Sequence, residues 1–226
     1  MADAYSVVMP AFDAADTIGD ALRSIAAQTV RPAQVIVVDD GSNDDTAHHA
    51  RSFGGALDIM VIRQANAGCG AATNTGIDAV TTPLHAYLDA DDIWLPHKAE
   101  TQLALLAARP ELSGLCGQCQ LFRGSVDAPE LGPVTDIWGR TSLMIRTEAA
   151  RAIGPIIDGG RGDMVDWLAR GREIGVRIEL APGIVGMRRI RPGSLSYGRD
   201  AEKDRGYLLA VKRALDRRRQ GSGGAQ

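Results

Sequence analysis

The first hundred residues alternate short apolar runs with stretches that have the spacing of amphipathic helices. The runs are rich in β-branched residues, and the run at 35–38 (Val-Ile-Val-Val) has no polar face. Continuous apolar strands of this kind are typical of parallel sheets buried on both faces. The alternation therefore predicts an α/β fold with a Rossmann-like, mostly parallel sheet flanked by helices. The expected strands are 5–9, 35–38, 58–62 and 84–88, and the expected helices are 17–28, 44–53, 70–80 and 96–108.

The second half of the chain breaks this rhythm and predicts a smaller, irregular part. A stretch rich in Gly, Pro and Asp, 123–136, predicts a loop between two strand-like runs. Ligands of parallel α/β sheets bind where the strands end at their carboxyl side, so we expect the first half to bind one ligand. The irregular half is then expected to form the pocket for a second substrate. Its expected elements are strands 115–122, 141–145, 177–180 and 184–188, and helices 163–174 and 200–219.

Charge and apolar content limit the classes of function. The chain has 25 basic and 28 acidic residues, a net charge of −3, which argues against a nucleic-acid partner because such proteins need a basic surplus. No apolar run reaches the ~18–20 residues that span a bilayer. The N-terminus lacks a signal-peptide pattern, and three cysteines are too few for a disulfide framework. A cytoplasmic enzyme is the expectation that follows.

Three carboxylates follow the fourth expected strand within four residues: Asp89, Asp91 and Asp92. They repel one another, and no basic residue lies between them. A hard divalent cation, Mn²⁺ or Mg²⁺, that shares its ligands with phosphate oxygens would compensate this repulsion. The alternative is a solvated loop in which Asp92 caps the following helix. We favour the metal site because a solvated loop gives no reason for so apolar a preceding strand.

Two further strand ends carry polar or small residues. Asp39 and Asp40 begin a tight turn, and the pair can accept hydrogen bonds from a base N–H and a ribose hydroxyl. A turn with a helix cap explains the residues after them equally well. Small residues at 65–72 let a ligand approach the backbone and the start of a helix. The dinucleotide fingerprint Gly-x-Gly-x-x-Gly is absent, because Thr73 stands in place of its third glycine.

Four motifs, taken in chain order, resemble those of the family 2 glycosyltransferases, which have the GT-A fold. The motifs are Val8-Met9-Pro10-Ala11-Phe12, Val37-Val38-Asp39-Asp40-Gly41-Ser42-x-Asp44, Asn66-x-Gly68 through Asn74-x-Gly76, and Asp89-Ala90-Asp91-Asp92-x-Trp94. The resemblance extends over about residues 5–195. It implies that a sugar is transferred with inversion from a nucleotide-diphosphate donor, of UDP type, to an acceptor hydroxyl, with Mn²⁺ or Mg²⁺ as cofactor.

The resemblance also implies roles for single residues. Asp91 is implied to be a direct metal ligand, and Asp89 to lie near the metal or the ribose, as in a DXD motif. Asp39 or Asp40 is implied to contact the base. The other donor-binding residues implied are Pro10, Ala11, Asn66, Gly68 and Asn74, and Arg191 is added to them as a departure from the family's pattern that can bind the diphosphate.

The family places a general base at the start of a helix in the second half, usually in an acidic pair. Here Asp163 matches the base, with Asp166 as the competing candidate, and Gly162 replaces the first acid of the pair. An inverting displacement needs one such carboxylate to take the acceptor's proton. Arg191 stands where many relatives have a metal-binding histidine. Arginine cannot bind a cation, but its guanidinium can pair with a diphosphate.

We expect one domain of the GT-A type at 1–220, followed by a flexible tail at 221–226. Its parts are a nucleotide-sugar-binding half (1–98), an acceptor and catalytic half (99–198) and a C-terminal helix (199–220). Two alternatives to a transferase stay open: an inactive module of the same fold that only binds a nucleotide sugar, and a sugar-nucleotide nucleotidyltransferase. The latter needs a Gly/Arg-rich loop after the first strand, where this chain has Met9-Pro10-Ala11-Phe12-Asp13.

The C-terminal helix is basic and has two interpretations. Leu208, Leu209, Val211 and Leu215 can form an apolar stripe that packs against the domain, which is the favoured interpretation. The helix can instead rest on an anionic membrane surface.

Overall fold

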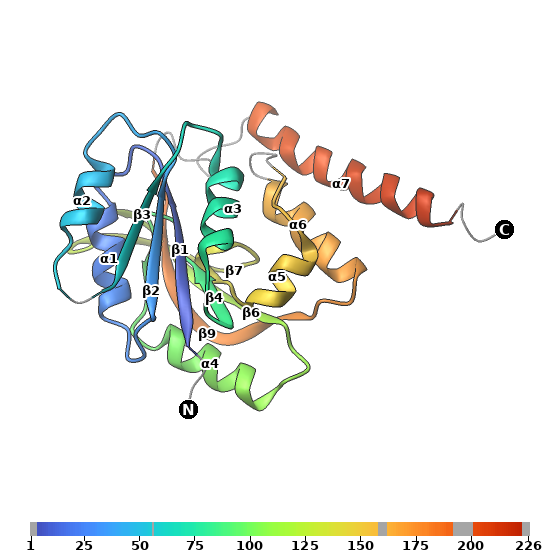
Figure 1. The fold of residues 1–226 in the computed structure, drawn as a ribbon, viewed down its shortest axis with the longest axis horizontal. Helices are drawn as coiled ribbons and strands as arrows, with labels where there is room; N and C mark the ends of the chain where they lie inside the picture. The colour runs from blue at the N-terminus through green and yellow to red at the C-terminus, as the bar shows by residue number, and fades with distance from the viewer. Residues whose placement is uncertain (1–3, 56, 158–161, 192–200, 223–226) are drawn as a thin grey trace.

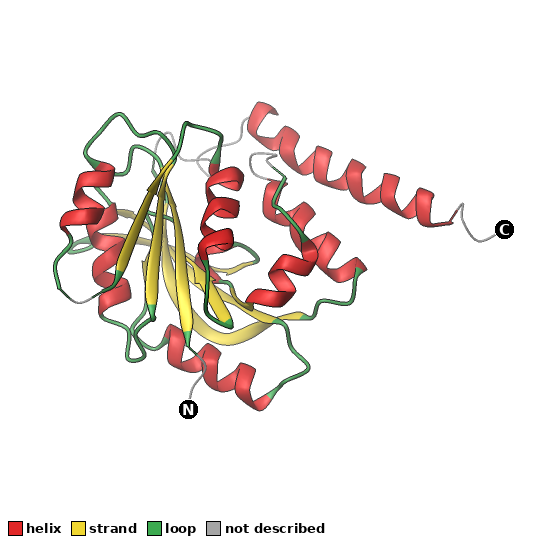
Figure 2. Ribbon diagram, viewed as in Figure 1, coloured by secondary structure: helices red, strands yellow, loops and turns green. Residues whose placement is uncertain are grey.

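The computed structural model describes residues 4–55, 57–157, 162–191 and 201–222 (Figures 1 and 2). Helices and short strands alternate in the first half, as the apolar pattern predicts. The elements are β1 (Tyr5–Ala11), α1 (Ile18–Ala26), β2 (Gln34–Asp39), α2 (Thr46–Ser52), β3 (Ile59–Arg63), α3 (Cys69–Ala79), β4 (Leu84–Tyr87), β5 (Ile93–Trp94), α4 (Lys98–Ala108), β6 (Gly114–Gly124), β7 (Pro129–Ile137), the 3₁₀ turn η1 (Arg140–Ser142), β8 (Met144–Arg146), α5 (Thr147–Ile153), α6 (Asp163–Glu173), β9 (Ile178–Arg189) and α7 (Ala201–Ser222).

The strands in the described residues form one nine-stranded sheet. Their order is β3-β2-β1-β4-β8-β6-β9-β5, with β7 beside β6. The first four strands are parallel neighbours, as predicted, whereas β8 runs antiparallel to both β4 and β6. Strands β2 and β3 lie on one side of β1, and β4 lies on its other side. The direction in which successive strands are added to the sheet therefore reverses between β1 and β4. A ligand crevice is expected at the carboxyl ends of those two strands.

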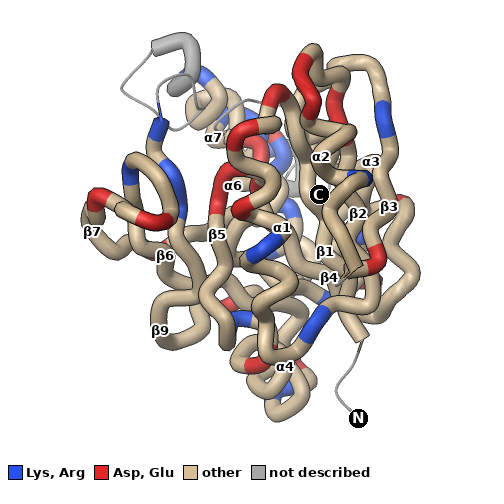
Figure 3. Tube along the Cα trace, turned by 90° about the vertical axis from the view of Figure 1, so that its left-hand side faces the viewer, with Lys and Arg blue, Asp and Glu red and all other residues tan. Residues whose placement is uncertain are grey.

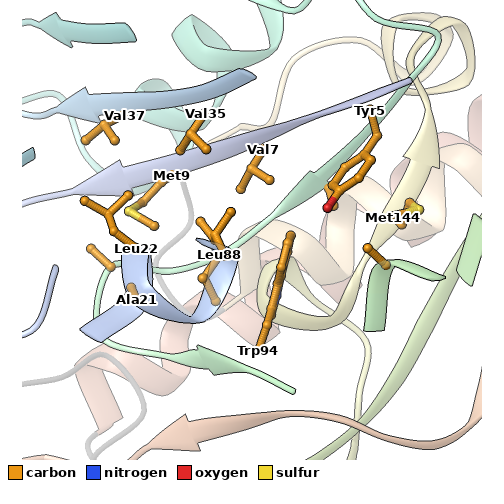
Figure 4. Close-up of a cluster of buried hydrophobic side chains, with 14 of the residues drawn as sticks. Tyr5, Val7, Met9, Ala21, Leu22, Val35, Val37, Leu88, Trp94 and Met144 are labelled. Atoms are coloured by element: carbon orange, nitrogen blue, oxygen red, sulfur yellow. The ribbon is translucent and has the colours of Figure 1, made fainter. Parts of the chain in front are cut away.

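Alternating side chains of the central strands build a core on each face of the sheet. Val7 and Met9 of β1 pack with Leu22 of α1 in one buried cluster. Val8, which lies between them, packs in the other cluster with Ala72 of α3. Figure 4 shows the first cluster, which includes Trp94 of β5. All seven residues of β1 are buried, which explains its largely apolar sequence; its buried polar residue Ser6 hydrogen-bonds through Oγ to Thr82 Oγ1.

Strand β1 continues through Pro10, although the sequence predicted that proline would end it. Val8 accepts a hydrogen bond from Leu88 N, so Val8 faces β4. Pro10, two residues later, faces the same side but lies beyond the paired part of β4, which ends at Tyr87. The missing N–H of Pro10 therefore breaks no bond of the ladder, and the strand is free to continue.

The second half differs from the sequence expectation in four places. The stretch 123–136 was predicted to be a loop, but most of it forms the end of β6 and the strand β7. The two short strands expected at 177–180 and 184–188 are one strand, β9, which pairs with β6 in parallel. The strand expected at 141–145 is instead the 3₁₀ turn η1 followed by the short strand β8, and helix α5 was not predicted. In the first half, the two-residue strand β5 was not predicted either. Strands β7 and β9 form because they pair with β6, and the local composition of a segment does not show such pairing with a distant strand.

Helix α7 extends two residues past the predicted end of the domain, to Ser222. The rest of the predicted tail, 223–226, lies outside the described residues. Within the described ranges, the structure has no helix of the length and apolarity that crossing a bilayer requires.

Lys98, at the start of α4, is a buried cation without a carboxylate partner in any ion pair of the described residues. It is 2% exposed, its Nζ donates to Gln102 Oε1 over 2.7 Å, and it lies 4.1 Å from the centre of the Trp94 ring. Burial lowers the pKa of Lys98 to about 7. The cost of holding this charge in the core is on the order of 5 kcal/mol below that pH.

We expect Lys98→Met to stabilise the protein by about 2 kcal/mol at pH 6. The variant removes the cost of the buried charge, and the Gln102 oxygen that loses its hydrogen-bond donor offsets about 1–3 kcal/mol of this gain. In the wild type, the unfolded chain holds the Lys98 proton up to a pH near 10.5 and the native state only up to about 7. Stability therefore rises with pH across this window, and the advantage of the variant disappears there. Urea unfolding at pH 6 and pH 10 measures both effects. The exposed Lys212→Met is the control, and a gain that is independent of pH would contradict the account.

Candidate active site

A cavity of about 670 Å³ opens at the carboxyl ends of β1 and β4, where the strand order reverses. Residues from both halves of the chain line it. The first half contributes the end of β1, the loop before α3 and the loop after β4; the second half contributes η1, the start of α6, the end of β9 and one residue of α7. Acidic and basic segments lie near one another around α6 and β5 (Figure 3). The cavity brings together Pro10, Ala11, Asp40, Asn66, Gly68, Asp89, Asp91, Asp163 and Arg191 among the predicted site residues.

The three carboxylates after β4 take different environments. The side chains of Asp89 and Asp91 are 29% and 20% exposed in the cavity, whereas Asp92 is almost fully buried. Asp92 Oδ1 accepts from Arg189 N over 2.8 Å, and its Oδ2 accepts from the Thr141 hydroxyl. Asp92 thus ties η1 and β9 to the end of β4, and it does not cap α4.

Burial and mutual repulsion act on the same cluster. Burial, with the nearby charge of Asp89, raises the pKa of Asp91 above its ordinary value. The pKa of Asp92 is raised well above its ordinary value by burial and by the charges of Asp91 and Asp89. Burial and like charges in this loop thus raise the pKa of both carboxyls, while Arg140 and Arg191 pair with Asp89 and Asp91.

Arg140 of η1, which no sequence motif indicated, joins the two halves of the site. Its Nε pairs with Asp89 Oδ1 over 3.2 Å, and its Nη1 donates to Asp163 Oδ2 over 2.7 Å. Its side chain is only 9% exposed. A cation shared by two carboxylates holds them in fixed relative positions. No local pattern marks Arg140, because both of its partners are distant in sequence.

The two candidates for the general base are separated by the structure. Asp163, at the first position of α6, lines the cavity, and its second oxygen accepts from Met164 N over 2.6 Å. Asp166 is not among the residues that line the cavity, and its carboxylate pairs with Arg170 and with Arg217 of α7. Asp166 therefore holds two helices together, and Asp163 faces the space in which a substrate would lie.

Gly162 precedes Asp163 at a point where no side chain fits. A Cβ built on Gly162 would lie 2.1 Å from the carbonyl oxygen of Gly206 in α7. An acid at this position, as in the family's acidic pair, would therefore displace α7. Glycine at position 162 is therefore what allows α7 to pack against the start of α6.

The acids after β2 position a loop. Asp40 Oδ1 accepts from Gln64 Nε2 and from Ala67 N, and Asp40 Oδ2 accepts from Gly68 N over 2.8 Å. Asp39 is fully buried and is not among the residues that line the cavity. Its Oδ1 accepts from Ser42 N, and its Oδ2 lies 3.3 Å from Arg63 Nε but has no hydrogen-bond partner among the described residues.

Asn74 lies away from the cavity. Its Nδ2 donates to Ile156 O over 2.9 Å, and its Oδ1 accepts from Ile156 N over 2.8 Å. Both ends of the amide are thus used to hold the segment after α5, 82 residues further along the chain. This geometry gives Asn74 a structural role in place of direct contact with a ligand.

Arg191 faces the acids after β4 from the end of β9. Its Nε pairs with Asp91 Oδ2 over 3.2 Å, and its side chain is 38% exposed. The neighbouring Arg189 is buried, and its Nε and Nη1 donate to Asp91 O and Gly124 O. Arg191 is therefore the more accessible of these two cations and the one that can turn towards an anion in the cavity.

Aromatic side chains, Trp138 and Tyr207 among them, line part of the cavity. Of the three tryptophans, Trp138 lines the cavity and is 48% exposed, whereas Trp94 and Trp167 are buried in the core. Tyr207 of α7 also lines the cavity. Cys69 lines it too, but burial raises the pKa of its thiol to about 12, so it is no thiolate nucleophile near neutral pH.

Comparison with known proteins agrees with this architecture. The sequence pattern described as Glycosyl transferase family 2 matches residues 6–154. The protein YibD of Escherichia coli K12, named an uncharacterized glycosyltransferase, is 32% identical over 168 residues, which are 74% of this chain and 43% of YibD. The glucosyltransferase WfgD of Escherichia coli is 30% identical over 45% of this chain and 40% of its own length. The chain thus spans less than half the length of these curated relatives.

Solved structures share the fold at low sequence identity. Staphylococcus aureus TarS in complex with UDP-GlcNAc matches 94% of this chain and 73% of its own with a TM-score of 0.71 and 16% identity. The mannosyltransferase PcManGT of Pyrobaculum calidifontis, in complex with GDP-Man and Mn²⁺, matches 95% of this chain and 70% of its own with a TM-score of 0.70 and 17% identity. From the matched pattern, the shared fold and the placement of the acids, we conclude that the chain belongs to glycosyl transferase family 2.

Proposed function

We propose that the protein transfers a sugar from a UDP-type nucleotide sugar to an acceptor hydroxyl, with inversion at the anomeric carbon and with Mn²⁺ or Mg²⁺ as cofactor. The observation that carries the proposal is the convergence of Asp91, Asp89 and Asp163 on one cavity at the carboxyl ends of β1 and β4. Membership of the family supports the reaction class. The UDP-GlcNAc bound to TarS supports a UDP-type donor.

The donor would lie across the ends of β1, β2 and β4. Pro10 and Ala11 line the cavity on one side, and Asn66 and Gly68 line it on another, in a loop that Asp40 fixes through backbone N–H groups. Of the two acids after β2, Asp40 lines the cavity and is the one that we place near the nucleoside, whereas the buried Asp39 supports the turn through Ser42 N. The small residues at the start of α3 allow the diphosphate to approach the helix N-terminus.

The acids after β4 fit a divalent cation that takes most of its ligands from the donor. Within the described residues, no group of three His, Cys, Asp or Glu side chains is arranged to enclose a metal ion. Mg²⁺ is commonly bound by only one or two carboxylates together with substrate phosphates, and Asp91 and Asp89 are two accessible carboxylates of that kind. When bound, such an ion supplies positive charge to the departing diphosphate. The Mn²⁺ bound to PcManGT supports this cofactor.

Asp163 is the base that we propose for the acceptor. As the acceptor oxygen forms a bond to the anomeric carbon, the bond from that carbon to the diphosphate oxygen breaks, and Asp163 takes the hydroxyl proton. Arg140 and Met164 N hold the carboxylate in one orientation. Because Arg140 also pairs with Asp89, the position of the base is coupled to the donor side of the cavity.

Arg191 would neutralise the leaving diphosphate from the side of β9. In the structure it pairs with Asp91, and we propose that it turns to phosphate oxygens when the donor and the cation bind Asp91.

We expect Arg191→Ala to lower kcat/KM by about 10²-fold, since it removes a cation that stabilises charge developing on the leaving group. The melting temperature should change little, because a partly exposed ion pair contributes about 0–1 kcal/mol. Steady-state kinetics and thermal unfolding measure the two effects. Arg123→Ala, an exposed arginine just before the end of β6, is the control. An unchanged kcat/KM for Arg191→Ala would remove this residue from the mechanism.

Release of UDP from a panel of UDP-sugars, with Mn²⁺ and with chelator, tests the proposed function. A transferase releases UDP in the presence of metal, slowly to water and faster with an acceptor, and NMR of the product gives its anomeric configuration. A protein that binds donor without releasing UDP is an inactive binding module, and release of pyrophosphate from UTP and a sugar phosphate indicates a nucleotidyltransferase. Either of these two results, or retention of configuration, contradicts the corresponding part of the proposal.

A further inference from the structure

The outward face of α7 is apolar and exposed, contrary to the favoured expectation that its apolar residues pack against the domain. Leu208, Val211 and Leu215 are 72%, 56% and 49% exposed. Their spacing of three and four residues places them on one face of the helix. They form a contiguous apolar stripe, which is uncommon on a solvent-facing helix and usually marks a binding surface.

Small residues and one arginine attach α7 to the domain through its opposite face. Gly206 and Ala210 are buried, and the backbone at Gly206 approaches Gly162 at the start of α6. Further along the helix, Arg217 Nη1 pairs with the buried Asp166 over 2.9 Å, and its Nε pairs with Glu173 over 2.8 Å. The helix is therefore held beside α6 in one rotation about its axis (Figure 1). Its apolar stripe is exposed on the side opposite the buried Gly206 and Ala210.

The charges beside the apolar stripe are basic. Arg205, Lys212 and Arg219 are exposed and seven residues apart, so they line one edge of the stripe. Residues 205–219 contain a single acid, Asp216, which is half-buried at the flank of this face one turn from Lys212. An apolar stripe bordered by long cationic side chains is complementary to a negatively charged surface with an apolar interior, which describes a bilayer that contains acidic lipids.

The same helix reaches the active-site cavity. Tyr207, next to Leu208, lines the cavity together with Asp163 and Val165. A surface bound to the outward face of α7 would therefore lie close to the acceptor side of the cavity.

We propose that the outward face of α7, made of Leu208, Val211, Leu215, Arg205, Lys212 and Arg219, binds the surface of an anionic lipid bilayer. The inference does not depend on the proposed chemistry. Three apolar side chains alone give weak binding, so the lipid charge is required: cations near such a surface each strengthen binding severalfold. The protein should bind acidic bilayers reversibly, and salt should weaken this binding.

Flotation of the full chain with vesicles of phosphatidylcholine alone, or with 30% phosphatidylglycerol, tests the inference. We expect binding only to the acidic vesicles and loss of that binding at about 0.5 M salt. Leu208→Asn with Val211→Asn should weaken it by about tenfold or more, and Lys212→Glu by about tenfold. The controls Leu131→Asn, 63% exposed on β7, and Arg51→Glu, exposed on α2, should bind like the wild type.

Insertion is measured separately by tryptophan fluorescence. Leu208→Trp should shift its emission to the blue on acidic vesicles, and Leu131→Trp should not. Absence of binding to acidic vesicles, or binding that the α7 substitutions leave unchanged, overturns the inference. Concentration-dependent dimerisation in the absence of lipid that Leu208→Asn with Val211→Asn abolishes would also overturn it, because the face would then be an interface between two copies of the chain. The substituted residues are exposed, so unchanged thermal unfolding confirms that each variant is folded.

Discussion

Asp91→Asn is expected to lower kcat/KM by about 10³-fold while leaving the fold as stable as before or more stable. The activity falls because the substitution removes the negative charge that we propose to hold the divalent cation against the diphosphate. The fold holds because burial and the charge of Asp89 already raise the pKa of Asp91, so the native state gains little from the ionised carboxylate. Within the part of the chain that the structure describes, the ion pair given up is the partly exposed one with Arg191.

Steady-state kinetics over a range of Mn²⁺ concentrations, with thermal unfolding, measures both effects. The apparent Mn²⁺ requirement of the variant should rise by at least tenfold. Asp136→Asn is the matched control, because Asp136 also lines the cavity but lies on β7 and is exposed. A variant that is inactive because it is unfolded would not support the account, and a folded variant with normal activity would exclude Asp91 as a ligand.

Asp163→Asn is expected to lower kcat by about 10³-fold, within the 10²–10⁴ that a general base usually contributes. Donor binding should change by less than threefold, since we place Asp163 on the acceptor side. The substitution removes one partner of the buried Arg140, so a loss of stability up to about 3 kcal/mol is expected, with Asp89 retaining the other half of the pair. Assays should therefore be made well below the melting temperature.

Asp166→Asn separates catalysis from structure. Asp166 pairs with Arg170 and Arg217, so this variant should loosen α7 and keep the chemical step within about tenfold of the wild type. Kinetics at saturating acceptor compares the two variants directly. If Asp166→Asn were inactive and Asp163→Asn active, the assignment of the base would be wrong.

Local sequence patterns predicted the elements of the first half, 1–98, well, because the burial of each of these strands and helices is visible in its own hydrophobic pattern. The β-branched runs are buried on both faces, and the acids after β4 follow directly from a buried strand. The prediction failed where the partner is distant. Strand β7 contains Gly and Pro that suggest a loop, yet its pairing with β6 makes it a strand. Arg140 shows no motif because its role arises only where η1 meets α6 and the end of β4.

Two misinterpreted elements illustrate the same limit. The motif that contains Asn74 suggested donor contact, but its amide is used by Ile156, which lies far along the chain. The apolar residues of α7 suggested an inward face, but the close approach of α7 to α6 requires the small residues Gly206 and Ala210 there. Hydrophobicity predicts burial only when the partner surface can accommodate the side chain.

Isothermal titration of UDP into the protein, with Mn²⁺ and then with excess chelator, tests the central claim most directly: that the acids after β4 are tolerated because a divalent ion links them to a diphosphate. We predict that UDP binding weakens by at least 30-fold with chelator, which corresponds to about 2 kcal/mol, and that Asp91→Ala binds UDP equally weakly with and without metal. If UDP bound wild type and Asp91→Ala with the same affinity in Mn²⁺ and in chelator, the claim would be contradicted.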